Sequence, residues 1–211
     1  MSRWEIRIAL VISLAVSVIP QGAVGAAPTT SDLVASLVVK GRAPKTGYTR
    51  AQFGPAWSDV DRNGCDTRND ILKRDLKAIA YKSAGDSCVI LSGLLIDPYS
   101  GESINFLRGV ATSSEVQIDH VVALSNAWQT GAFKLSADTR KAFANDPLNL
   151  LAVKGSLNSQ KSDGDAATWL PPRKSYRCAY VSRQVAVKVK YGLWITAPEK
   201  AAILGVLKSC L

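Results

Sequence analysis

The sequence contains a single histidine, His120, among 211 residues. A hydrolase that works near neutral pH often uses histidine as its base, because an unperturbed pKa of about 6.5 lets the ring accept a proton there. If the chain is such an enzyme, His120 is therefore the candidate base. The scarcity of histidine, together with the absence of any C-x-x-C spacing, argues against a zinc site.

Long apolar runs are also lacking. The apolar run at the N-terminus, residues 8–19, is shorter than the roughly 20 residues that a membrane-spanning helix needs. It follows Arg3 and Arg7 and leads into small residues around Ala26, a pattern typical of a secretory signal peptide. We expect residues 1–26 to be this signal peptide, with an uncleaved anchor as the alternative. After cleavage the protein would be extracellular, with no stable membrane insertion.

Cysteines are few but even in number. The four are Cys65, Cys88, Cys178 and Cys210. An even count in an exported chain indicates two disulfides, for which three pairings are possible. We favour Cys65–Cys88 and Cys178–Cys210, because each would close a loop within one end of the chain.

The charge of the chain is strongly positive. Without residues 1–26 it retains 185 residues, with 24 basic and 16 acidic side chains and a formal charge of +8. This length suffices for one domain with a real core. The charge suits a polyanionic partner, which could be nucleic acid, an anionic wall polymer or a membrane surface.

We divide the mature chain into a flexible N-terminal segment, residues 27–47, with a short helix near 33–39, and a domain of residues 48–211. Apolar spacing and turn signals predict the following elements: a helix at 67–82, a hairpin at 88–108, a strand at 116–124, short helices at 125–133 and 137–143, a strand at 148–153, a short helix from 156, and a final helix at 198–209. Strand and helix compete for 176–190, where the spacing slightly favours a helix.

Several motifs occur in a fixed order along the chain. They are NGCDTRNDIL at 63–72, VQIDHVVALSNAW at 116–128, FANDPLNLLAV at 143–153, NSQKSDGDAATWLPP at 158–172 and YRCAYV at 176–181. From Gly64 to Cys210 the chain resembles secreted bacterial HNH endonuclease family proteins. These belong to the branch whose domain also occurs at the C-terminus of GmrSD-type restriction enzymes.

The resemblance implies a division of roles at one site. His120 would deprotonate a water, while Asp119 and Asn158 would bind one divalent metal, most simply Mg²⁺, with Mn²⁺ or Ca²⁺ as alternatives. Asn149 would hold the loop between the two strands of the site and fix the imidazole. Lys161 would contact a phosphate.

Arg68 is a second candidate for phosphate contact. It belongs to a charged cluster with Asp59, Asp61, Arg62 and Asp66, which either lies near the active site or is only scaffold. Two departures from the common HNH pattern are visible in the sequence. Asn158 replaces the final histidine, and Ala123 stands where many relatives have proline.

Other interpretations of these residues stay open. Asp119 and His120 would point to opposite faces of a regular strand, so a bulge or a strand end is needed if both serve one site. Asn149 could simply satisfy backbone groups, Asn158 could be a helix N-cap, and Lys161 could be a solvated surface charge.

We therefore expect an α+β fold. It would be a single domain with an embedded ββα-metal finger, mainly helical surroundings and two disulfides. The expected protein is a monomeric, metal-dependent endonuclease that cuts DNA, and RNA as a second substrate, largely without sequence preference. One alternative is a non-catalytic basic module that binds nucleic acid or a wall polymer. Another is a phosphodiesterase acting on lipid or wall teichoic substrates.

Overall fold

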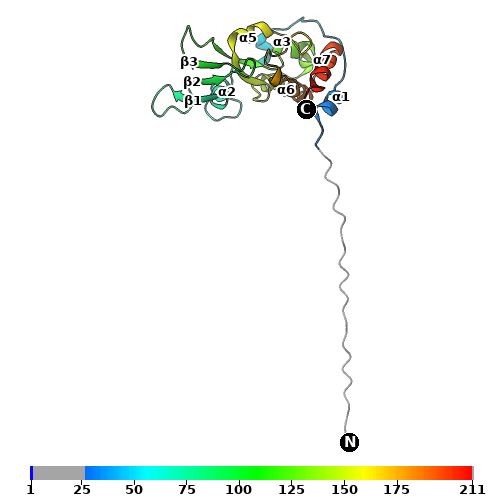
Figure 1. Ribbon diagram of the computed structural model, residues 1–211, viewed down its shortest axis with the longest axis horizontal. Helices are drawn as coiled ribbons and strands as arrows, with labels where there is room; N and C mark the ends of the chain where they lie inside the picture. The colour runs from blue at the N-terminus through cyan, green and yellow to red at the C-terminus, as the bar shows by residue number, and fades with distance from the viewer. Residues whose placement is uncertain (2–26, 211) are drawn as a thin grey trace.

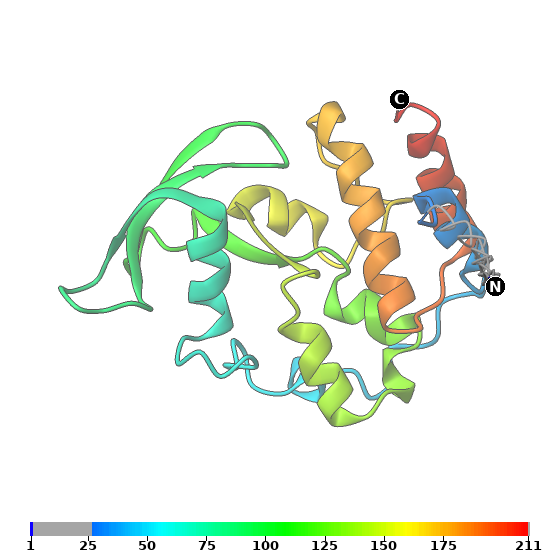
Figure 2. The same ribbon diagram turned by 90° about the horizontal axis from the view of Figure 1, so that it is seen from below.

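The three-stranded sheet and the C-terminal helices lie at opposite ends of the molecule (Figure 1). The computed structural model describes Met1 and residues 27–210, so the predicted signal peptide, apart from Met1, lies outside the described residues. A three-stranded sheet lies at one end, and α1, α6 and α7 lie at the other (Figure 1). Figure 2 shows the same separation from a second direction. This mixture of helix and sheet confirms the α+β class.

The first sheet is an antiparallel meander of β1 (Leu76–Tyr81), β2 (Ile90–Ile96) and β3 (Ser103–Leu107). The predicted hairpin at 88–108 is confirmed by β2 and β3. Its turn is closed where Gly101 N donates to Asp97 O over 2.7 Å.

The predicted helix at 67–82 is wrong in its second half. The helix α2 (Thr67–Asp75) ends where β1 begins. Leu76 pairs with Leu95 of β2 and is buried, so strand pairing prevails over the helical spacing of the apolar residues. The register of β1 on β2 shifts between Lys77 and Ala80, a bulge in which Ala78 has a φ of +47°.

The second sheet consists of two antiparallel strands, β4 (Val116–His120) and β5 (Leu150–Lys154). His120 pairs with Leu150, so the histidine is the last residue of its strand. The helix α5 (Gly155–Lys161) follows β5 directly and packs against both strands. The predicted order of strand, strand and short helix is therefore present as a ββα unit.

Helices occupy the long connection between β4 and β5. They are α3 (Leu124–Gln129), the 3₁₀ turn η2 (Ala132–Lys134) and α4 (Ala137–Ala144). The α4 helix packs on a further 3₁₀ turn, η1 (Arg50–Phe53). This packing brings residues near 50 beside the end of β4.

The competition between strand and helix at 176–190 is settled in favour of helix. After the 3₁₀ turn η3 (Lys174–Tyr176), α6 (Arg177–Lys190) buries Tyr180, Val181 and Gln184 at helical spacing. The last helix is α7 (Ala197–Leu207), which starts with a capping box at Thr196 and Glu199.

The N-terminal segment is part of the packed domain. The helix α1 (Thr30–Ser36) buries Val34 completely and contacts α6 and α7. Val39 then forms a parallel bridge with Ile195. The expected short helix is therefore present, but the description of 27–47 as a flexible segment separate from the domain needs correction.

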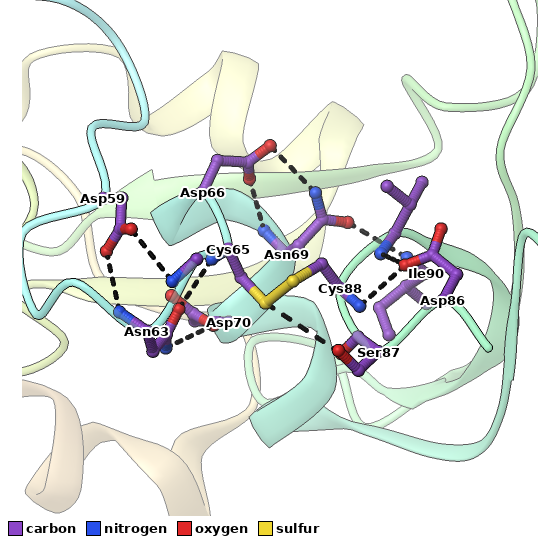
Figure 3. Close-up of a disulfide and its surroundings, with 12 residues drawn as sticks. Asp59, Asn63, Cys65, Asp66, Asn69, Asp70, Asp86, Ser87, Cys88 and Ile90 are labelled. Carbon is purple, nitrogen blue, oxygen red and sulfur yellow. Dashed lines mark hydrogen bonds between the residues drawn. A yellow bond between two sulfur atoms is a disulfide. The ribbon is translucent and has the colours of Figure 1, made fainter.

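The two predicted disulfides are confirmed. Cys65–Cys88 ties the start of α2 to the chain just before β2 (Figure 3), and Cys178–Cys210 ties α6 to the chain after α7. Each closes a loop within one end of the chain. Within the described residues, the helices are all too short or too polar to span a membrane.

Candidate active site

His120 lies at the end of β4 with its ring almost fully buried. Its Nε2 lies 2.8 Å from the carbonyl oxygen of Ala144, at the end of α4. A carbonyl oxygen can only accept, so Nε2 carries the proton and Nδ1 keeps a free lone pair. Burial lowers the pKa of His120 to about 4, although the bond to Ala144 opposes this effect. The ring is therefore a neutral base near pH 7.

A cavity of about 650 Å³ opens beside this ring. No residue of β5 lines it, so it lies along the edge of β4 that β5 does not pair. Its lining is mostly polar and carries more basic than acidic side chains. The lining residues that matter below are Lys45, Arg50, Trp57, Arg68, His120 and Asn158.

Arg50 and Arg68 supply the positive charge of this cavity. Arg68 reaches it from α2 and donates to Val116 O over 3.4 Å. Lys45 is already paired with Asp163 at 2.6 Å. The cavity can therefore receive an anion, and Arg68, a candidate for phosphate contact, lines the same cavity as His120.

Asn149 holds the chain that follows His120. Its side chain accepts from Val122 N over 2.8 Å and donates to Val122 O over 3.3 Å. Its own carbonyl accepts from Val121 N. The expected support of the loop by Asn149 is thus visible. The imidazole itself is held by Ala144 rather than by Asn149.

Asp119 and Lys161 form a buried ion pair between β4 and α5. Lys161 Nζ donates to Asp119 Oδ1 over 2.9 Å and to His120 O over 2.8 Å. Tyr99 donates to the other carboxylate oxygen over 2.6 Å. The Lys161 side chain has no exposed surface, and it does not line the cavity. The predicted phosphate contact of Lys161 is therefore replaced by a contact inside the protein.

Asn158 lies one turn before Lys161 on α5 and does line the cavity. Its Nδ2 donates to Gln117 Oε1 over 2.8 Å. Gln117 and Asp119 therefore both face α5, while His120 contacts Ala144 on the other side of β4. The expected opposition of Asp119 and His120 is real, and no bulge brings them together.

The predicted pair of metal ligands does not fit a shared cation in this arrangement. Both donors have suitable oxygen chemistry, but both carboxylate oxygens of Asp119 are engaged by Lys161 and Tyr99. Among the described residues, no group of three or more histidine, cysteine or acidic side chains is placed to hold a metal ion.

The acidic part of the charged cluster lies beside a disulfide rather than on the cavity. Asn63 donates its backbone N–H to Asp59 and its side-chain amide to Asp70, next to Cys65–Cys88 (Figure 3). Of the cluster, Arg68 lines the cavity, while the aspartates belong to the turn before α2. The cluster is thus mainly scaffold.

Two cavity residues, Arg50 and Trp57, are missing from the sequence-based candidates. Trp57 stacks on His120, with ring centroids 6.1 Å apart and 15° between the planes. The charge of Arg50 contributes to the lowered pKa of the histidine, after the larger effect of burial. The one available signal in the sequence is a tryptophan placed just after the Gly54-Pro55 turn.

Together, the fold and site define a disulfide-braced α+β domain built on a ββα unit, with a neutral histidine beside a basic cavity. The family model for the C-terminal domain of GmrSD restriction endonucleases matches residues 66–206. The chain therefore belongs to this family. This match runs from α2 into α7 and includes every residue predicted to act in catalysis, metal binding or phosphate binding.

A similar protein is known from Arthroderma benhamiae (strain ATCC MYA-4681 / CBS 112371). It is described as an uncharacterized secreted protein and is 37% identical over 186 residues, which cover 87% of this chain and 86% of the relative. No solved structure matches the chain.

Proposed function

We propose that the chain is a secreted, metal-dependent endonuclease of the HNH type. Its substrate would be DNA, cut largely without sequence preference, with RNA as a second substrate to test. The observation that carries the proposal is the state of His120, a neutral ring with a free Nδ1 beside a basic cavity. Membership of a restriction endonuclease domain family supports the same chemistry.

In this mechanism His120 accepts a proton from water at Nδ1. The bond from Nε2 to Ala144 O fixes the tautomer and would become stronger as the ring gains positive charge. Arg50 and Arg68 would bind the phosphate and offset the negative charge that develops on its oxygens. Asn149 keeps the histidine in place through Val122.

A divalent cation, Mg²⁺ before Mn²⁺ or Ca²⁺, is part of the proposal as a requirement to be tested. Such an ion would supply charge neutralisation at the phosphate. Asn158 lines the cavity with an oxygen donor, whereas Asp119 would first have to lose its bond to Lys161. No step of the mechanism is therefore assigned to the ion.

We also propose that the protein acts outside the cell as a monomer. The similar protein from Arthroderma benhamiae is described as secreted, and the two disulfides of this chain are of the kind that forms and persists in oxidising compartments.

Incubation of the mature protein with supercoiled plasmid tests the function directly. Nicked and linear DNA should form with Mg²⁺ and not with EDTA. Binding without cutting, unaffected by EDTA, would instead identify a non-catalytic basic module. Cutting in EDTA would leave the nuclease proposal in place and remove the metal from it.

A further inference from the structure

Trp57 is the aromatic neighbour of the catalytic candidate. Its ring stacks nearly parallel to the imidazole of His120, with centroids 6.1 Å apart. The two residues are far apart in sequence, since Trp57 belongs to the segment between η1 and α2. Both rings line the large cavity and also a second cavity of about 10 Å³.

The backbone of Trp57 adopts a conformation that bulky residues rarely take. Its φ is +58°, in the left-handed region that favours glycine. Neighbours on both sides hold the segment there. Phe53 is buried against Phe143, and Thr67 Oγ1 donates to the carbonyl oxygen of Ser58. These contacts fix the backbone on either side of Trp57 and so maintain its unfavourable conformation.

The imidazole needs such a neighbour. Its one hydrogen bond among the described residues joins Nε2 to Ala144 O. That bond fixes the position of one nitrogen, and the groups packed against the buried ring determine how far the imidazole can tilt. A flat aromatic surface against the imidazole restricts the tilt, and so fixes the direction of the Nδ1 lone pair.

We propose that Trp57 is a positioning residue, whose indole ring fixes the plane of His120 for proton transfer. The inference rests on the proposed role of His120 as the base. A misdirected base loses rate in the chemical step rather than in substrate binding, by roughly 10- to 100-fold for a displacement of about 1 Å. The effect belongs in kcat and not in KM.

Steady-state cleavage of DNA by Trp57→Leu and Trp57→Phe tests this role. Leucine keeps apolar bulk without an aromatic face, so kcat should fall about 10- to 100-fold with KM little changed. Phenylalanine should restore most of the loss. Trp194→Leu is the matched control, because Trp194 is equally half-buried and lies outside the cavity, and it should leave kcat unchanged.

Should Trp57→Leu fail to fold, Trp57→Asn replaces it, because asparagine tolerates a positive φ and has no aromatic face. A change in KM alone would overturn the positioning role and identify Trp57 as a surface for a nucleobase. Equal kcat for Trp57→Leu and the wild type would also overturn it.

The single histidine gives a readout that does not depend on activity. The mature protein should show one pair of imidazole C–H signals in a ¹H–¹³C spectrum, from His120 alone. The indole ring should displace them upfield, and Trp57→Leu should return them towards ordinary values. Unchanged signals in that variant would overturn the stack.

The two proposals fail in different ways. Equal cleavage by His120→Ala and the wild type overturns the proposed function, and the positioning role with it. An inactive His120→Ala beside a fully active Trp57→Leu overturns the positioning role alone.

Discussion

At the scale of single residues, Asn149 is important because of its contacts with the backbone. It is fully buried and satisfies both polar groups of Val122, two residues after His120. Asn149→Ala would leave two buried backbone groups without partners, each at a cost of about 1–3 kcal/mol. We expect a lower free energy of unfolding, measured in urea, together with loss of cleavage.

Asn105→Ala is the matched control for this change. Asn105 is exposed on β3, in the other sheet from the one that carries His120. Its replacement should change neither the free energy of unfolding nor cleavage. Wild-type stability in Asn149→Ala would contradict the role given to its amide.

Asp146, in the segment between Ala144 and Asn149, makes the stability of the fold depend on pH. Burial alone would raise the pKa of its carboxyl, but hydrogen bonds from Lys190, Leu148 N and Tyr191 outweigh it and lower the pKa. A carboxyl whose pKa is lower in the folded state stabilises the fold above the unfolded pKa of about 3.9. The contribution is lost as pH falls through the folded value.

Asp146→Asn should therefore be less stable than the wild type near neutral pH, and the difference should shrink below about pH 3.9. Melting temperatures of both proteins across the acid range measure this. A difference that stays constant with pH would show that the carboxylate charge contributes nothing.

At the scale of elements, the Asp119–Lys161 pair joins β4 to α5. Lys161→Met would leave a buried carboxylate without its cation, which typically costs about 3–5 kcal/mol. Lys154→Met is the matched control, because Lys154 forms an exposed pair with Glu102 and such pairs contribute about 0–1 kcal/mol. The free energy of unfolding, measured in urea, should therefore fall much further in Lys161→Met than in Lys154→Met.

The same variants distinguish a structural lysine from one that binds phosphate. If Lys161→Met unfolds like Lys154→Met but binds DNA more weakly than it, Lys161 contacts phosphate in solution and the ion pair seen here is secondary.

The elements that local pattern determines could be predicted from the sequence. The β-branched Val116 and Ile118 alternate along a strand, and the four-residue spacing of Tyr180 and Gln184 correctly predicts a helix. The segment 76–81 could not be predicted, because Leu76 and Ile79 suit a helix and only the pairing with β2 makes them a strand. Such pairing depends on residues remote in the sequence.

The candidate site divides in the same way. The order of Asp119, His120 and Asn149 could be recognised from motifs. The orientation of Lys161 could not, because a lysine three residues after Asn158 can point to solvent or to the core. Trp57 was missed because no motif links it to β4, and only the packing of η1 on α4 places it there.

At the scale of the whole molecule, the proposed function assigns DNA binding and DNA cleavage to different features. Without residues 1–26 the chain carries a formal charge of +8, with 24 basic side chains spread over the sequence. Such charge binds nucleic acid through its phosphates, with an affinity that falls steeply with salt. In the proposed mechanism, hydrolysis would depend instead on the buried ring of His120.

The most direct test is therefore His120→Ala in the mature protein, assayed for plasmid cleavage and for DNA binding at the same salt concentration. We predict wild-type binding and near-complete loss of cleavage. Wild-type cleavage by His120→Ala would contradict the account.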